Sequence, residues 1–147
     1  MINIKPLKAY TDNYIWLLET NEEVSVVDPG DAKPVLDYLS KTNKNLRDIF
    51  ITHHHFDHTA GVPELENIIS GSIYGPKNSY ELINEKVTQG DTLSSLGIKF
   101  EIIEVPGHTL DHVAFYNEEN NILFCGDTLF AGGCGRVFEG TFDQMFE

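Results

Sequence analysis

The chain is built around one stretch, Thr52-His53-His54-His55-Phe56-Asp57-His58, which follows directly on the apolar run of residues 49–51. His53 and His55 are separated by one residue, so an extended backbone places both side chains on the same side. The chain then turns, so Asp57 and His58 can face a second metal position next to the one that His53 and His55 face. A site with two metal ions requires this, because separate ligand sets must converge on ions about 3.5–4 Å apart. We therefore interpret the stretch as a metal site, in preference to a solvated histidine-rich loop.

Length and charge limit the other classes of function. The 147 residues are predicted to form one domain, residues 1–147. The formal net charge of −13 argues against a nucleic acid or an anionic membrane as partner and leaves a small molecule as the expected one. No apolar run approaches the ~18 residues of a membrane span, and residues 1–6 lack the pattern of a signal peptide. We therefore expect a cytoplasmic protein.

Hydrophobic periodicity predicts a layered α/β sandwich. Predicted strands cover residues 2–7, 14–19, 24–27, 46–52, 72–75, 86–88, 91–96, 98–105, 111–116 and 122–125. One predicted helix covers residues 33–41, with its cap at or just after Asp31. A second covers residues 61–69, with Val62, Leu65, Ile68 and Ile69 facing inward. Residues 77–84 are expected to form either a short helix or an irregular loop.

Three strand ends carry groups that bind metals: the 52–58 stretch, His108 and Asp127. His108 follows Gly107 in a loop, and Asp127 follows Gly126 after the apolar strand 122–125. A histidine or an aspartate at one such position is, taken alone, most often structural. Glycine beside each lets the backbone approach a ligand closely, and loops at strand ends hold the active sites of α/β sheets. The joint pattern therefore predicts one shared metal centre.

These motifs resemble the metallo-β-lactamase superfamily. The matching segments span the whole chain and are residues 12–17 (DNYIWL), 27–30 (VDPG), 52–58 (THHHFDH), 106–109 (PGHT) and 126–130 (GDTLF). Within the superfamily, residues 133–141 (GCGRVFEGT) resemble the glyoxalase II (hydroxyacylglutathione hydrolase) family. The resemblance implies a metallo-β-lactamase-like αββα sandwich of the α/β (α+β) class.

The same resemblance implies ligands for two divalent metal ions. They are His53, His55 and His108 for one ion, Asp57 and His58 for the other, and Asp127 as a bridge between the two. An aspartate at the bridging position favours the hydrolase branch, where a thiolate would suggest a lactamase-like arrangement. Zinc is the expected metal, with Fe and Mn as alternatives because histidine and carboxylate ligands suit all three. Asp57 is also implied as a catalytic residue that orients or accepts a proton.

Three further polar residues keep more than one interpretation. His54 points away from its neighbours in an extended segment, so we expect it to be exposed or to contact a ligand from outside. His112 is interpreted as a structural residue or as a hydrogen-bond partner of a ligand. Asp28 either orients a ligand or closes an Asx turn, and the sequence leaves both open.

The reaction implied by the resemblance is metal-dependent hydrolysis of a thioester. The family converts S-lactoylglutathione, an S-2-hydroxyacylglutathione, to glutathione and D-lactate in methylglyoxal detoxification, through a hydroxide that bridges the two ions. Arg136 is expected to bind the glycyl carboxylate of glutathione, and Phe138 to give a ring contact. The alternatives are another hydrolase of the superfamily, acting on a different ester, lactam or phosphodiester, and a non-catalytic metal-binding module.

One departure from the family pattern concerns the C-terminal end of the sequence. The family supplies a further histidine to the second metal downstream of the bridging aspartate, and the sequence ends at Glu147 before that position. We therefore expect the second half of the sandwich to be incomplete, a helical substrate domain to be absent and the second metal site to be weak. An open sheet edge would then favour self-association.

Overall fold

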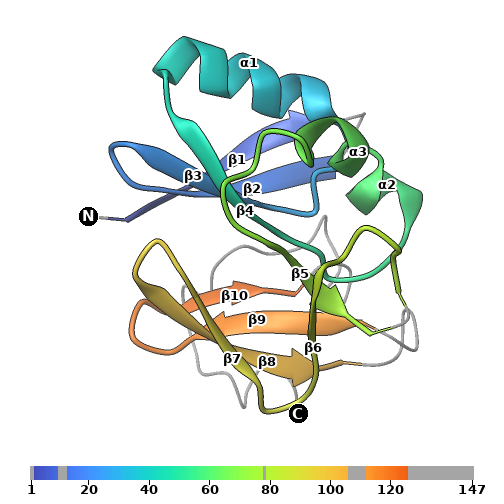
Figure 1. The fold of residues 1–147 in the computed structure, drawn as a ribbon. Coiled ribbons are helices and arrows are strands. Elements are labelled where there is room, and N and C mark those ends of the chain that lie inside the picture. Colours follow the sequence, from blue (N-terminus) through green and yellow to red (C-terminus); the bar gives the residue numbers. More distant parts are fainter. Residues whose placement is uncertain (1, 10–12, 78, 106–111, 126–147) are drawn as a thin grey trace.

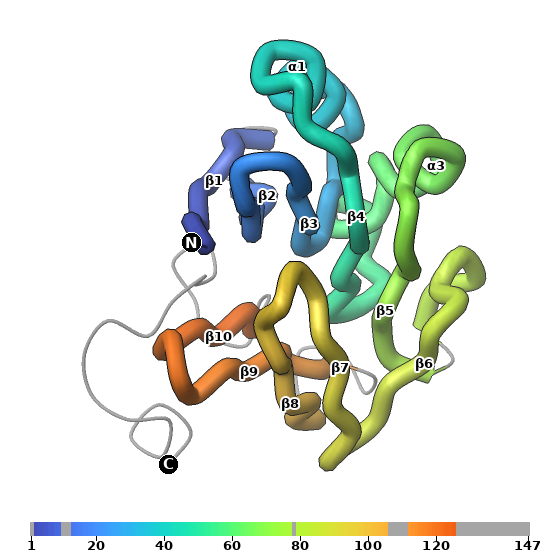
Figure 2. Tube along the Cα trace, turned by 60° about the vertical axis from the view of Figure 1, so that its left-hand side comes forward, coloured from blue at the N-terminus to red at the C-terminus, as the bar shows by residue number. Residues whose placement is uncertain are grey.

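The structure is a computed structural model that describes residues 2–9, 13–77, 79–105 and 112–125. The strands within these ranges form two sheets, and helices cover the outer face of the first (Figure 1). Figure 2 shows helix α1 (Ala32–Thr42) above strands of the first sheet, with the second sheet below them. These layers confirm the predicted α/β sandwich. None of the described helices is long and apolar enough to cross a membrane.

The first sheet has the strand order β1-β2-β3-β4-β5-β6 among the described residues. Its strands are β1 (Asn3–Ala9), β2 (Asn13–Glu19), β3 (Glu23–Val27), β4 (Asn45–Phe50), β5 (Ile73–Pro76) and β6 (Glu85–Val87). The first three are antiparallel neighbours, and β3 to β6 run parallel. The sheet is therefore mixed. Its parallel strand β4 leads into residues 52–58, which we call the metal-site stretch.

The second sheet is antiparallel, with the order β10-β9-β8-β7 among the described residues. Its strands are β7 (Thr92–Ser95), β8 (Ile98–Glu104), β9 (Val113–Asn117) and β10 (Ile122–Phe124). Although only residues 88–91 separate β6 from β7, the two strands belong to different sheets. Residues 88–91 are thus the crossing from the first sheet to the second.

Two hydrophobic cores hold the layers together. Phe50 from the first sheet packs with Phe100 and Phe115 from the second, at ring-centroid distances of 5.4 and 5.0 Å. On the other face of the first sheet, Val35 of α1 and Leu65 of α3 (Val62–Leu65) join the core between sheet and helices. Burying such side chains contributes about 1.5–3 kcal/mol each. Both faces of the first sheet are therefore apolar, which explains its runs of consecutive apolar residues.

A buried polar chain also joins the two sheets. Ser95 of β7 donates from its hydroxyl to Asp48 Oδ2 of β4 at 2.7 Å, and lies 2.7 Å from the hydroxyl of Ser25 in β3. The amide of Asp48 in turn donates to the Ser25 hydroxyl at 3.2 Å. The exposed fractions of these side chains are 3% or less. Each polar group thus has a partner within the interface between the sheets, as burial requires.

The helices differ partly from the prediction. Asp31 caps α1 as expected, accepting a hydrogen bond from the amide of Lys33 at 3.1 Å. The helix predicted for residues 61–69 ends at Leu65, and Ile68, predicted to face inward, is 47% exposed. The amides of Ser70 and Gly71 donate to carbonyls of β4 instead of continuing a helix. Residues 77 and 79–84 form no helix, so the alternative of an irregular loop describes them better.

Strand directions bring several loops to one edge of the first sheet. Val27 at the end of β3 pairs with Phe50 at the end of β4, and it also pairs with Trp16 in the middle of antiparallel β2. The start of β2 therefore extends past the ends of β3 and β4 at the same edge of the sheet. The 52–58 stretch leaves the sheet at this edge and enters the short helix α2 (Phe56–Thr59).

Candidate metal centre

Asp28, the residue after β3, is the organising group of the site. It is 4% exposed and has a φ of 51°. Its carboxylate accepts hydrogen bonds from the amide of Thr52 at 2.7 Å, from the Thr52 hydroxyl at 2.6 Å and from His58 Nδ1 at 2.9 Å. β4 ends two residues earlier than predicted because the Thr52 amide is held by this carboxylate rather than by a strand. Asp28 thus joins the loops after β3 and β4.

The ionisation of Asp28 fixes the proton on His58. Burial alone would raise the pKa of Asp28, but the charge and the hydrogen bond of His58, the charge of His53 and the hydrogen bond of Thr52 leave the pKa below its ordinary value. A carboxylate only accepts hydrogen bonds, so His58 Nδ1 carries the proton of their contact. In the neutral imidazole, Nε2 then keeps a lone pair for a metal.

Thr52 fixes the tautomer of His53 in the same way. The Thr52 hydroxyl has a single proton, which it donates to Asp28 Oδ2. Its contact of 2.9 Å with His53 Nδ1 must therefore be one in which the hydroxyl oxygen accepts and Nδ1–H donates. His53 is fully buried, and its Nε2 becomes the nitrogen that offers a lone pair. One carboxylate thus sets the tautomers of two predicted ligands, one from each ligand set.

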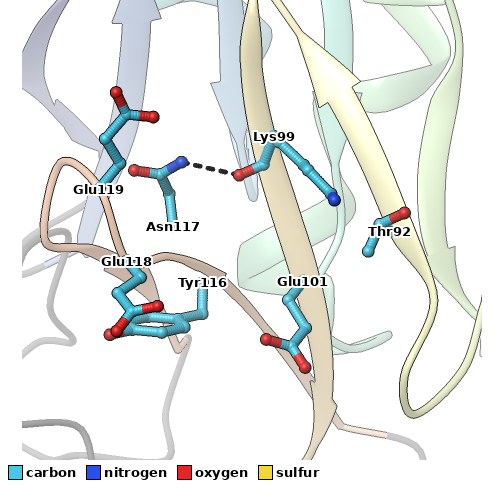
Figure 3. Close-up of a pocket in the computed structure, with 7 residues that line it drawn as sticks. All are labelled: Thr92, Lys99, Glu101, Tyr116, Asn117, Glu118 and Glu119. Carbon is cyan, nitrogen blue, oxygen red and sulfur yellow. Dashed lines mark hydrogen bonds between the residues drawn. The ribbon is translucent and has the colours of Figure 1, made fainter.

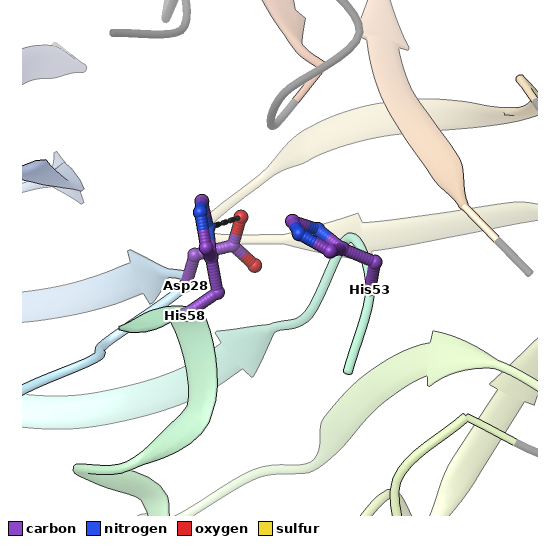
Figure 4. A group of neighbouring side chains, drawn as sticks. All are labelled: Asp28, His53 and His58. Carbon is purple, nitrogen blue, oxygen red and sulfur yellow. Dashed lines mark hydrogen bonds and ion pairs between the residues drawn. The ribbon is translucent and has the colours of Figure 1, made fainter. Parts of the chain in front are cut away.

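Figure 4 shows Asp28, from the loop after β3, beside His53 and His58 of the 52–58 stretch. Their potential ligand atoms all lie within 4.8 Å of one another, the spacing of a metal cluster. Asp28 is better described as the group that orients His58, because both of its oxygens already accept hydrogen bonds from described residues. Of the two interpretations that the sequence left open, the orienting role fits these contacts, and none of them closes an Asx turn.

Asp57 and His58 place their ligand atoms where they can share a second metal ion. Asp57 Oδ2 lies 3.7 Å from His58 Nε2. Two ligands that each lie about 2.0–2.2 Å from one ion are separated by less than ~4.4 Å, so this pair fits a shared ion without rearrangement. The Asp57 side chain is 49% exposed, and it accepts a hydrogen bond from the amide of Asn13.

The histidine rings agree only partly with the alternation argument. His53 and His55 lie edge to face with ring centroids 4.7 Å apart, and His54 is exposed as expected, but its ring also lies edge to face with His55 at 5.2 Å instead of pointing away. His112 is 1% exposed, and its ring stacks on His53 at 4.5 Å with an interplanar angle of 15°. His112 therefore supports a predicted ligand from the second sheet, in line with its structural interpretation.

The structure thus brings four predicted site residues, His53, His55, Asp57 and His58, into one region. The other predicted site residues are His108, Asp127, Arg136 and Phe138, and they lie outside the described residues. Sequence analysis missed the parts played by Asn13 and Thr52. Thr52 stands beside a predicted ligand, which was an available signal. Asn13 lies 44 positions from Asp57, and only the fold brings the two together.

A separate hollow lies on the second sheet and has different chemistry. It has a volume of ≈ 460 Å³ and is lined by Thr92, Lys99, Glu101, Tyr116, Asn117, Glu118 and Glu119 (Figure 3). Three carboxylates and a single lysine are among its lining residues, so the charge of the hollow disfavours an anion. None of the four site residues within the described ranges, His53, His55, Asp57 and His58, lines it. It is therefore a poor candidate for the site of an anionic substrate.

Comparison with known proteins agrees with this geometry. A family model described as the metallo-beta-lactamase superfamily matches residues 11–146. A curated relative from Pseudoalteromonas translucida, named hydroxyacylglutathione hydrolase, is 50% identical over 99% of this chain. The chain spans 58% of that relative's length.

Solved structures give the same picture of the fold. The structure is similar to that of BLEG-1 B3 metallo-beta-lactamase, with a TM-score of 0.76, 21% identity and coverage of 87% of this chain and 73% of the other. It is also similar to TTHA1623 in a di-iron-bound form, with a TM-score of 0.69, 27% identity and coverage of 91% and 77%.

Proposed function

The chain belongs to the metallo-beta-lactamase superfamily, and on that premise we propose that it hydrolyses S-lactoylglutathione, an S-2-hydroxyacylglutathione, to glutathione and D-lactate. The observation that carries the proposal is the oriented ligand set. Asp28 holds His58 directly and His53 through Thr52, in each case at Nδ1, and this selects the tautomer whose Nε2 carries the lone pair that a metal ligand needs. The name of the relative at 50% identity supports the choice of a glutathione thioester over a lactam.

We propose that His53, His55 and His108 hold one divalent ion, that Asp57 and His58 hold a second, and that Asp127 bridges them. The described donors suit such ions, because neutral imidazole and carboxylate bind Zn, Fe and Mn. Zinc is the metal we propose. When bound, two such ions lower the pKa of a water molecule toward neutrality and polarise a carbonyl oxygen.

The chain's own residues position and exchange protons in this scheme. Water adds its oxygen to the thioester carbonyl carbon, the C–S bond breaks, and the products are a carboxylic acid and a thiol. The leaving thiol has an ordinary pKa near ~8.5, by analogy with cysteine, so its thiolate departs without a strong general acid. Asp57 lies at the exposed side of the site, where we propose that it orients the attacking water or accepts its proton. Asp28 and Thr52 keep the histidines aligned throughout.

We further propose that residues 1–147 act as one catalytic domain and that Arg136 and Phe138 bind the glutathione part of the substrate. Arg136 suits a carboxylate because its guanidinium donates two parallel hydrogen bonds. The physiological role that follows from this substrate is methylglyoxal detoxification in the cytoplasm.

A substrate comparison tests the proposal. S-lactoylglutathione and a chromogenic β-lactam should be supplied to the zinc-loaded protein, and we expect hydrolysis of the thioester alone. Arg136→Ala should raise KM for the thioester more than it lowers kcat, because the contact is remote from the bond that breaks. Hydrolysis of the lactam but not the thioester would assign the chain to another activity, and an unchanged KM would remove Arg136 from the binding site.

A further inference from the structure

Asn13 makes a contact with the metal-site stretch that the proposed mechanism does not yet use. Its side-chain nitrogen lies 3.0 Å from Asp57 Oδ2 and 3.3 Å from the main-chain oxygen of Asp57. Both partners only accept hydrogen bonds, so the amide NH2, and not the amide oxygen, must face them. One nitrogen therefore holds the carboxylate and the main chain of the same residue.

This contact restrains a side chain for which the described residues give one other close polar contact, that with His58 Nε2. Asp57 is 49% exposed, and a free aspartate on a surface samples several staggered rotamers. The Asn13 amide selects the rotamer in which Oδ2 also lies 3.7 Å from His58 Nε2. Oδ2 keeps one lone pair beside this hydrogen bond, and Oδ1 offers two more. Asn13 thus favours the arrangement in which Asp57 and His58 reach a common ion.

The backbones of Asn13 and Asp57 are themselves held by neighbouring segments. Asn13 is the first residue of β2, where it pairs with Ala9 of β1. Gly30, in the loop after β3, also approaches Asp57: a side-chain carbon there would come within 1.8 Å of the Asp57 carbonyl oxygen, so only glycine permits the observed approach of the two backbones. The Asp57 backbone therefore contacts both the start of β2 and the loop after β3.

We propose that Asn13 is a positioning residue that pre-organises Asp57 for the second metal ion. The proposal rests on the two-metal site proposed above. It predicts a selective effect, because Asn13 contacts Asp57, whereas the described hydrogen bond and ring contacts of His53 are with Thr52, His55, His58 and His112 and not with Asn13. Removing a group that orients a metal ligand lowers metal affinity by about 10–100-fold.

Zinc affinities measured by chelator competition test the proposal. In Asn13→Ala, we expect the dissociation constant of the weaker-binding zinc to rise about 10–100-fold, with that of the other zinc unchanged. We also expect kcat to fall by a larger factor than KM changes. Asn13→Asp should weaken the same site further, because an acceptor of like charge then faces the Asp57 carboxylate. Near-ultraviolet circular dichroism checks that both variants remain folded.

Asn117→Ala is the matched control. The Asn117 amide donates to the Lys99 carbonyl at 2.8 Å on the second sheet, so its loss should leave both zinc affinities unchanged. Equal weakening of both zinc sites in Asn13→Ala would assign Asn13 a purely structural role, and unchanged affinities would overturn the proposal. These outcomes are read from zinc binding alone. They are therefore independent of a finding that the wild-type protein binds zinc yet fails to hydrolyse the thioester, which would overturn only the proposed function.

Discussion

Asp28 adopts a left-handed backbone conformation, with a φ of 51°, that residues other than glycine rarely adopt. Such conformations cost about 1–3 kcal/mol and persist where the surroundings enforce them. Here the enforcing contacts are those of the carboxylate with Thr52 and His58. The conformation turns the chain sharply after β3 and aims the carboxylate at the metal-site stretch, so the local strain serves the orientation of two predicted ligands.

Thr52 gives the sharpest prediction at this scale. Thr52→Val removes the hydroxyl that accepts from His53 Nδ1–H and donates to Asp28, in a fully buried position. We expect a loss of about 1–3 kcal/mol in the free energy of unfolding and about 10–100-fold weaker zinc binding. Urea unfolding and zinc titration measure the two effects. Thr52→Ser keeps the hydroxyl and should retain zinc affinity; equal zinc affinities of the Val and Ser variants would contradict the tautomer argument.

Spacing alone predicted the convergence of His53, His55, Asp57 and His58, because neighbouring positions on one segment are constrained by backbone geometry. The assignment of each as a ligand stays a prediction. The contacts of Asn13 and Asp28 with this segment could not be predicted in the same way. They depend on the pairing of β2, β3 and β4, which is a property of the sheet rather than of any local pattern.

At the scale of elements, Glu19 ties helix α1 to the first sheet. It ends β2, is 1% exposed, and accepts a hydrogen bond from the Tyr38 hydroxyl of α1. Lys44 and Lys5 lie 2.9 and 3.2 Å from its carboxylate. Burial alone would raise the pKa of Glu19, but these three partners outweigh it and leave the pKa below the ordinary value of 4.5. Glu19 is therefore a charged group that the fold keeps ionised.

The sign of the resulting pH dependence follows from the direction of that shift. Because the pKa is lower in the folded state, the contribution of Glu19 to stability is present above pH 4.5 and is lost as the pH falls through the folded-state pKa. Glu19→Gln should lower the free energy of unfolding by about 1.5–3 kcal/mol at pH 7, and the difference from wild type should shrink in acid. Urea unfolding at several pH values measures it, with exposed Glu22→Gln as control; a difference that does not vary with pH would refute the assignment.

The elements with strong periodicity were predicted within a few residues, as α1 and β8 illustrate. The helix predicted for residues 61–69 was too long, because backbone groups at residues 70–71 bond to β4 and draw the chain into the sheet. Hydrogen bonds between segments so far apart along the chain leave no local signal in a single sequence. Tertiary hydrogen bonds decided where that helix ends.

At the scale of the whole molecule, the two sheets pack through an aromatic core and a buried polar chain. The sandwich could be predicted from the motifs, but the division of strands between its sheets could not, because β6 and β7 follow one another along the chain yet belong to different sheets. Residues of the first sheet's loops carry most of the described site. His112, which follows β8 and precedes β9, adds the support of the second sheet to His53.

The most direct test of the central claim is whether thioester hydrolysis depends on metal held by these residues. The protein should be stripped with a chelator, reloaded with increasing zinc, and assayed with S-lactoylglutathione while bound zinc is measured. We expect activity to vanish on stripping and to return in proportion to bound zinc. His55→Ala should abolish the return, whereas His54→Ala, at an exposed position, should not. Hydrolysis that survives complete removal of metal, or that returns equally in His55→Ala, would contradict the account.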